Sequence, residues 1–346
     1  MMGALCIFGT GMVSAVGLSA PASCAAIRCA IDNFQETRFI DRGGEWLLGA
    51  SVPLEQSWRG RSKLIKMAAR AIAEALQGTP GIDPAQTPLL LGVAEQERPG
   101  RLAGLDGQLL KDIEQELGLA FHPSSSIIAR GRVSGAVALL NARKLVYQGG
   151  HRHVLIAGVD SFLNATTLTT YEERQRLLSS QNSNGFIPGE GAAAVVVGAP
   201  FVSEEPQLAC LGLGFGMEPA TVESEEIPLR AEGLTQAIRA ALAEVGCGLE
   251  KMDYRVTDLS GEQYYFKEAS LALSRTLRVR KEFFHLWHPA DCIGEVGAAI
   301  GPAMLVVALA ACRKAYGDGP NVLCHLGNDA GQRAAAILRY QPVRAG

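Results

Sequence analysis

The sequence predicts an α/β protein of five layers, in the order αβαβα, whose two halves repeat one order of elements. Short, continuous apolar runs bounded by glycine or polar residues are typical of strands buried on both faces of a sheet. Each half also contains one helix that is hydrophobic on nearly every side, and such a helix must be buried over most of its surface. Strands and helices alternate in both halves, so two sheets enclosing these two helices account for the pattern.

The N-terminal half is expected to span residues 1–202. Its clearest helix has an apolar stripe formed by Leu64, Ala68, Ile72 and Leu76. Further elements follow from apolar runs between polar or glycine-rich segments. We expect strands at 4–13, 87–94, 153–161 and 189–199, and helices at 61–76 and 133–149.

The C-terminal half is expected to span residues 206–346, with the polar stretch 203–207 connecting it to the first half. Gly246 follows an amphipathic run and is suited to a helix C-cap. The remaining elements repeat the order of the first half. We expect strands at 206–217, 254–261, 321–327 and 334–340, and helices at 229–246, 262–277 and 296–316.

Composition excludes several classes of protein. The chain has 346 residues, of which 48% are hydrophobic, and a net charge of −3, which predicts no nucleic-acid partner. No apolar run reaches the length of a membrane span. The eight cysteines are scattered without metal-binding spacing, so we expect buried thiols in a reducing compartment, no metal and no cofactor. The apolar N-terminus lacks the basic region of a signal peptide, and we therefore expect a cytoplasmic protein.

Several segments together resemble the β-ketoacyl synthase branch of the thiolase-like superfamily. The two most specific are "GTGMVSAVG" at 9–17 and "NGFIPGEGAAAVVV" at 184–197, the second being close to the family's GFxxGEGA motif. The resemblance implies a thiolase-like fold over most of the chain. Weaker matches are "IAGVDSFLNATTLTTYEE" (156–173), "VTDLSGE" (256–262), "CIGEVGAAIG" (292–301) and "LCHLGNDA" (323–330).

The glycines of the second motif have a physical interpretation that does not need the family. Gly185, Gly189 and Gly191 predict a turn with positive φ or a close backbone approach before a buried strand. Glu190, between them, is expected to be held by backbone N–H groups in a structural role. This motif therefore supports the fold and carries no catalytic argument.

The resemblance also implies where a ketosynthase would keep its catalytic groups. The family uses a cysteine thiolate at the entrance of a buried helix and two histidines that stabilise developing negative charge. Alignment on the flanking motifs places Arg132 at the cysteine position, and Ser260 and Gly294 at the histidine positions. Arginine stays protonated and cannot act as a nucleophile, and its bulk would fill the place of an acyl thioester. The sequence therefore predicts a catalytically degenerate member.

A remnant of the acyl pocket is expected around Arg132. Ser134 offers a hydroxyl nearby but has no evident base partner, and Glu262 and Glu295 are expected to pair with Arg130 or Arg132. The predicted pocket residues are Arg132, Ser134, Asp258, Glu262, Glu295, Phe186 and Asn328.

A rebuilt catalytic site is the rival interpretation. The stretch "HLWHPADCIGEVG" (285–297) places Cys292, His288 and Asp291 close together, as a thiolate, a base and an orienting group would be. Alternatively, carboxylates of this region could bind a cation. Against both, adjacent residues rarely face one another, and Pro289 indicates a rigid turn.

Three functional hypotheses follow. The preferred one is a non-catalytic protein that binds another protein, as an accessory or chaperone-like scaffold; the resemblance extends to short, site-degenerate members found among type VI secretion genes, where the partner would be an effector. The second is a partner subunit of an active ketosynthase, or an acyl-chain binder; carrier protein is a further partner of this class. The third is an acyltransferase with a rebuilt site around Cys292 and His288. A homodimer is expected, formed by edge pairing of the strand at 153–161 with its twin.

Overall fold

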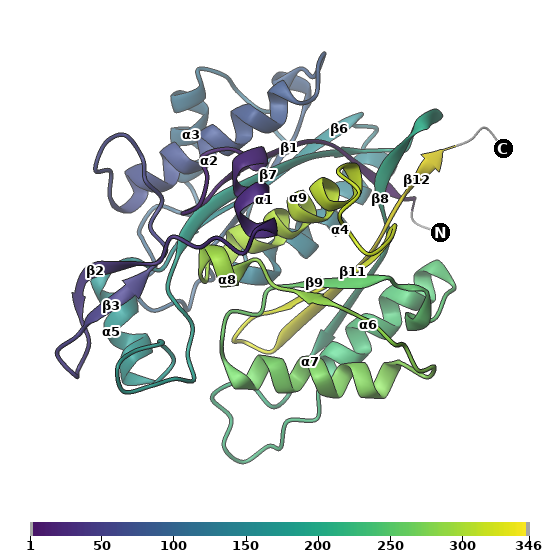
Figure 1. Cartoon of the computed structure of the whole chain (residues 1–346). Helices are drawn as coiled ribbons and strands as arrows, with labels where there is room; N and C mark the ends of the chain where they lie inside the picture. The colour runs from purple at the N-terminus through teal and green to yellow at the C-terminus, as the bar shows by residue number, and fades with distance from the viewer. Residues whose placement is uncertain (1–2, 344–346) are drawn as a thin grey trace.

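The computed structural model describes residues 3–343 and contains one ten-stranded mixed sheet wrapped around two central helices (Figure 1). The strand order is β10-β9-β11-β12-β8-β1-β7-β6-β4-β5. The two halves of this sheet are joined where Leu5–Ile7 of β1 pair with Leu208–Cys210 of β8. A separate hairpin, β2 with β3, lies beside the sheet.

The N-terminal half closely follows the predicted order of elements. Its long strands and helices agree with the predictions to within a few residues, and it adds short helices and a hairpin that the sequence did not reveal. The elements are β1 Leu5–Val13, α1 Ala20–Arg28, β2 Gln35–Ile40, β3 Trp46–Gly49, α2 Gly60–Gln77, β4 Leu89–Val93, α3 Leu109–Leu117, β5 Ser126–Ala129, α4 Ser134–Tyr147, β6 His153–Ser161, α5 Ala165–Glu173 and β7 Glu190–Gly198.

The C-terminal half also matches the prediction. Gly246 caps α6 with φ +73°, as expected of a glycine that ends a helix. The elements are β8 Ser203–Met217, α6 Glu232–Val245, β9 Tyr254–Thr257, α7 Gln263–Thr276, β10 Leu286–Trp287, α8 Ala290–Ile293, α9 Ile300–Arg313, β11 Asn321–Gly327 and β12 Gln332–Val343.

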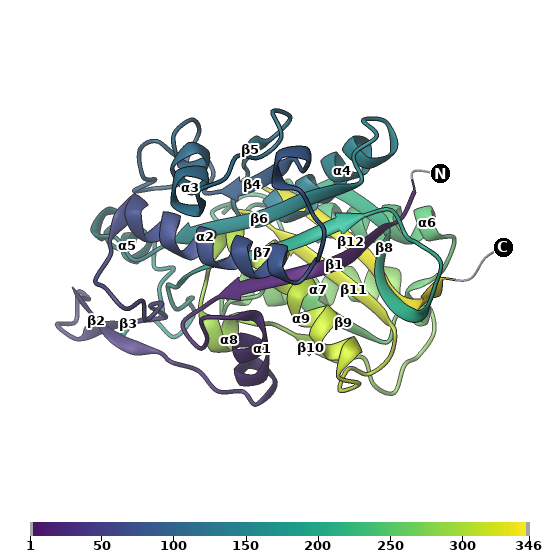
Figure 2. The ribbon, with the colours of Figure 1, turned by 90° about the horizontal axis from the view of Figure 1, so that it is seen from above.

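The five predicted layers are present. Helices α2 and α3 cover the outer face of the N-terminal part of the sheet, and α6 and α7 cover the outer face of the C-terminal part (Figures 1 and 2). Helices α4 and α9 lie between the two parts and contact strands of both. The near-continuous burial of α9 follows from this position, because its neighbours on all sides are apolar.

The two central helices show the internal duplication most clearly. Each has 14 residues and follows a short 3₁₀ turn that begins with a glycine, Gly131 at φ +53° and Gly297 at φ +51°. The helices cross at equivalent glycines, since a Cβ on Gly135 would lie 2.8 Å from the Cα of Gly301. Only glycine permits so close an approach of two backbones.

Two sequence-based expectations about strands are wrong. The strand at 153–161 is β6, which lies between β7 and β4 and presents no free edge for pairing with a twin. The outermost strands are β5 and β10. The stretch 203–207 is not a connector, because it forms the first part of β8 and pairs with β12. Strand order depends on long-range pairing, which apolar runs do not encode.

Among the described residues no helix combines the length and apolar character needed to span a bilayer. All eight cysteines are free thiols. Most are buried as expected, whereas Cys29 is exposed.

Candidate functional site

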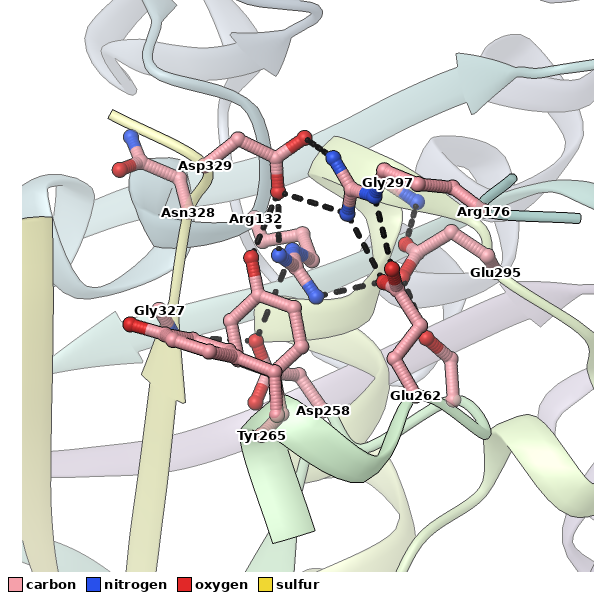
Figure 3. Close-up of polar contacts among 12 residues, drawn as sticks. Arg132, Arg176, Asp258, Glu262, Tyr265, Glu295, Gly297, Gly327, Asn328 and Asp329 are labelled. Atoms are coloured by element: carbon pink, nitrogen blue, oxygen red, sulfur yellow. Dashed lines mark hydrogen bonds and ion pairs between the residues drawn. The ribbon is translucent and has the colours of Figure 1, made fainter. Parts of the chain in front are cut away.

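A cluster of charged side chains occupies the entrances of α4 and α9, where the ketosynthase resemblance places a catalytic centre (Figure 3). The 3₁₀ turn Gly131–Val133 carries Arg132 into the cluster, and the turn Gly297–Ala299 provides the facing wall. Loops after β9 and β11 approach from the C-terminal half. The site is therefore built from both halves of the chain.

Arg132 is almost completely buried, with 6% of its side chain exposed, and lies among three carboxylates. Its guanidinium nitrogens lie 2.9 Å from Asp329, 3.4 Å from Glu295 and 3.8 Å from Asp258. The guanidinium also stacks over the ring of Tyr265, at 4.4 Å from the ring centre. Since buried arginine requires such partners, the surroundings of Arg132 are built to hold a permanent cation.

A second arginine, Arg176, closes the cluster from the segment after α5. It donates to both oxygens of Glu262, at 2.7 and 2.8 Å, and to Asp329 at 2.6 Å. Glu262 therefore pairs with Arg176, and its expected pairing with Arg130 or Arg132 is wrong. Asp329 also accepts a hydrogen bond of 2.6 Å from the hydroxyl of Tyr265. Because Asp329 pairs with both Arg132 and Arg176, it joins the two arginines.

A third buried arginine, Arg98, extends the cluster toward α9. It lies 2.7 Å from Glu95 and 3.2 Å from Asp160, and it stacks over Phe162 at 4.0 Å. Asp160 in turn accepts from the backbone N–H of Ala298 at 3.0 Å. Glu95 and Arg98 come from the loop between β4 and α3, for which the sequence predicted no role in a site.

The charges do not balance within the cluster. Three arginines face six carboxylates, Glu95, Asp160, Asp258, Glu262, Glu295 and Asp329. Burial raises the pKa of Asp160 and of Asp258, although each has an arginine beside it. Burial likewise raises the pKa of Glu295 to about 6, against the opposing effect of Arg132.

Asp329 behaves in the opposite way. Burial disfavours its charge, but Arg176 and Arg132 outweigh that effect and hold the pKa of Asp329 well below its usual range. Asp329 and Glu295, two of the three carboxylates that flank Arg132, therefore differ: the pKa of Asp329 lies well below its ordinary value, and the pKa of Glu295, about 6, lies above its ordinary value of 4.5.

Of the three positions that the alignment assigns to catalytic residues, Arg132 and Ser260 meet at one carboxylate, whereas Gly294 lies in the turn beside it. Ser260 donates a hydrogen bond of 2.9 Å to Glu295, the same carboxylate that Arg132 contacts. Gly294 directly precedes Glu295 and has φ +71°, a conformation that side-chain-bearing residues rarely adopt. Glu295 itself also accepts from the backbone N–H of Gly297 at 2.8 Å.

The other predicted pocket residues divide into two groups. Phe186 and Asn328 border the cluster, and Asn328 bonds Gln332 and the backbone of Arg130 as part of a turn. Ser134 lies outside the cluster, because its hydroxyl donates to the carbonyl of Ile128 at 2.9 Å. The space left among the clustered side chains is only about 10 Å³, less than a ligand requires.

Glu190 has the structural role expected of it. Its carboxylate accepts from the backbone N–H of Val52 and from the hydroxyls of Ser51 and Ser161, each at 3.0 Å, and pairs with Lys63. The motif glycines have no positive φ and are instead places of close backbone approach: a Cβ on Gly189, for example, would lie 2.6 Å from a carbonyl oxygen.

The residues of the rival catalytic set lie apart from the cluster. Nδ1 of His288 lies 2.8 Å from Asp291 without the alignment of a hydrogen bond. Burial, together with Asp291 and Asp32, raises the pKa of the Cys292 thiol to about 11, which disfavours a thiolate. Within residues 3–343, no group of three His, Cys, Asp or Glu side chains is arranged to hold a metal ion.

Comparison with known proteins gives the same fold. No family model matches the sequence. A protein assigned as beta-ketoacyl synthase 2 for the polyketide actinorhodin in Streptomyces coelicolor is 26% identical over 208 residues, which cover 56% of this chain and 49% of that protein. The match thus spans about half the length of this curated relative.

Solved structures of ketosynthases match almost the whole chain. The ketosynthase ApeO in complex with its chain length factor ApeC, from Xenorhabdus doucetiae, gives a TM-score of 0.76 at 13% identity, over 97% of this chain and 98% of that one. The ishigamide ketosynthase/chain length factor gives 0.70 at 18% identity, over 97% and 99%. The chain therefore has the thiolase-like ketosynthase fold.

Proposed function

We propose that this chain is a non-catalytic ketosynthase-like protein that acts by binding another protein, as the partner subunit of a catalytically complete ketosynthase. The observation that supports this proposal is that Arg132 and three carboxylates fill the entrance of α4, where the resemblance implies an acyl thioester. A guanidinium cannot attack a thioester, and about 10 Å³ of space leaves no room for one. A cytoplasmic location is part of the same proposal.

The energetics of the cluster support a scaffold role. Ion pairs between loops of both halves fill the space around Arg132 and favour a rigid core without chemistry. Each of the three arginines has both a carboxylate and an aromatic ring beside it: Tyr265 for Arg132, Tyr171 for Arg176 and Phe162 for Arg98. These contacts of the arginines stabilise one arrangement of the loops from both halves.

The choice of partner rests on the relatives. Two of the matched structures are described as a ketosynthase with a chain length factor, and both match nearly all of this chain. The free edge of β5 offers a place for association, since β5 is the outermost strand of the N-terminal part and bonds only β4 among the described residues. Unpaired strand edges invite pairing with another chain.

Co-expression with a catalytically complete ketosynthase of the same genome tests the proposal. We expect native mass spectrometry to show a complex of one copy of each chain. Ile127→Pro in β5 should abolish the complex, whereas Leu286→Pro at the opposite edge of the sheet should preserve it, with circular dichroism confirming that each variant is folded. A homodimer or a monomer of this chain in the presence of the ketosynthase would contradict the partner-subunit role.

The other two hypotheses stay predictions. A role as a chaperone of a type VI secretion effector would give a complex with the effector in place of the ketosynthase in the same measurement. An acyltransferase centred on Cys292 requires a thiolate, and the raised pKa of Cys292 disfavours that requirement.

A further inference from the structure

A cavity of about 490 Å³ opens where the sheet ends, between β10 and the end of α1. Helix α1 lies beside α8 in both views of the ribbon, and β10 is the last strand of the C-terminal part (Figures 1 and 2). The cavity is about as large as the sites that hold drug-sized molecules. It is distinct from the charged cluster, with which it shares no lining residue.

Aromatic and aliphatic side chains form most of the cavity wall. Trp287 and Tyr316 present nearly parallel rings, with centres 6.1 Å apart and planes 17° apart. Ile27 and Val307 supply aliphatic surface, and the buried thiol of Cys292 behaves as a small apolar group because its pKa lies near 11. Flat ring faces of this kind favour flat, apolar ligands.

Arg28 provides the positive charge at the rim of the cavity. Its guanidinium lies 4.5 Å above the ring of Tyr316, and within the described part of the chain it forms no ion pair. The rim carboxylate, Asp291, already lies beside His288. Arg28 is thus the rim charge left to interact with an anion.

We propose that this cavity binds a planar aromatic molecule that carries one carboxylate or sulfonate group. The rings of the ligand lie along Trp287 and Tyr316, and its anionic group contacts Arg28. Binding here is non-covalent and requires no contribution from the charged cluster. The proposal goes beyond the partner-subunit function and does not depend on it.

Two probes with similar rings test the proposal. Anilinonaphthalene sulfonate carries the anionic group, and neutral phenylnaphthylamine does not. The chain has three tryptophans, so the double variant Trp46→Phe, Trp58→Phe leaves Trp287 as the single one. We expect the sulfonate to quench Trp287 emission in a saturable titration and to bind about fivefold more tightly than the neutral probe.

Three further variants locate the binding. Arg28→Glu should remove the preference for the sulfonate, and Ile27→Tyr should fill the cavity and abolish binding of both probes. Lys111→Glu, a charge reversal on the distant helix α3, should leave both affinities unchanged. Unfolding curves check that each variant is folded. Unchanged Trp287 emission at saturating probe, or equal binding by Arg28→Glu, Ile27→Tyr and the parent, would overturn the proposal.

Discussion

The charged cluster around Arg132 and the cavity around Trp287 are formed partly by one short segment, yet one is filled and the other is open. Residues 286–289, Asp291 and Cys292 line the cavity, whereas Glu295 lines the cluster. The turn at Gly294, with φ +71°, separates the two directions. The space that remains differs by a wide margin: about 10 Å³ in the cluster and about 490 Å³ in the cavity.

The difference follows from the side chains in the two regions, which are charged in the cluster and mainly aromatic or aliphatic in the cavity. Guanidinium groups and carboxylates form strong, directional ion pairs. Arg132 and Arg176 both pair with Asp329, and these pairs hold loops of both halves together and leave little space in the cluster. Aromatic rings at the edge of a sheet form no ion pairs that would hold distant loops against them. Since β10 is the outermost strand of the sheet in the described part of the chain, Trp287 has neighbouring strands on one side only. Filled and open sites should therefore respond differently to substitution.

The largest expected effect is that of Arg132→Ala. The variant leaves Asp258, Glu295 and Asp329 without the cation that they share, and removing one member of a buried ionic group costs about 3–5 kcal/mol of unfolding free energy. Chemical denaturation provides the measurement. Arg28→Ala at the cavity rim is the matched control, for which we expect a loss below about 1 kcal/mol. Equal losses in the two variants would remove the distinction between the regions.

Gly294→Ala tests the turn that separates the two sites. We expect a loss of about 2–3 kcal/mol, because positive φ strains an alanine and its Cβ would lie 2.9 Å from the carbonyl oxygen of Ile187. Gly81→Ala measures the cost of the positive φ alone, since Gly81 has φ +81° and a Cβ there would contact no other atom. If both variants lose the same stability in urea denaturation, the packing part of the explanation is wrong.

Glu295→Gln tests the charge of the cluster through its pH dependence. The pKa of Glu295 in the folded protein, about 6, lies above its unfolded value of 4.5, so its stabilising contribution is complete below pH 4.5 and is lost as pH rises to 6. Glutamine stays neutral throughout. The stability of the variant relative to the parent should therefore rise by about 1–2 kcal/mol between pH 4 and pH 7.

Denaturation curves at several pH values measure this rise. Glu282→Gln, at an exposed position, supplies the baseline. A relative stability that stays constant, or that falls with increasing pH, would show that Glu295 is not held in the way described.

The smallest effect is expected in the open cavity. Ile27→Tyr adds volume to a space of about 490 Å³ and should change the free energy of unfolding by less than about 0.5 kcal/mol. Ser260→Leu adds volume beside the closed cluster and removes the hydrogen bond to Glu295, and it should cost about 1–3 kcal/mol. Thermal unfolding of the two variants in parallel distinguishes them.

Sequence reasoning reached the fold and part of the site for identifiable reasons. Apolar runs and the two hydrophobic helices determine the layers, and motif spacing led to Arg132, Ser260 and Gly294. Spacing cannot reveal Arg98 and Arg176, because their partners lie in other loops: Arg176 and Asp329, for example, are separated by 153 residues along the chain. An arginine in a polar loop gives no sign that folding will bury it.

The free strand edge was misplaced for a similar reason. An apolar run such as 153–161 indicates a buried strand, and it does not say which strands lie on either side. The glycine motif was more informative, because close backbone approach restricts the residue type at each position. The sequence thus predicts where the backbone requires a glycine better than it predicts which strands pair with one another.

Intact-protein mass spectrometry after incubation with acyl-coenzyme A and acyl-carrier protein tests the central claim most directly. The account predicts that the chain keeps its unmodified mass, because Arg132 and its carboxylates fill the space at the entrance of α4 and the raised pKa of the Cys292 thiol disfavours a thiolate. A covalent acyl adduct on Cys292, or on any other side chain of the cluster or the cavity, would contradict it.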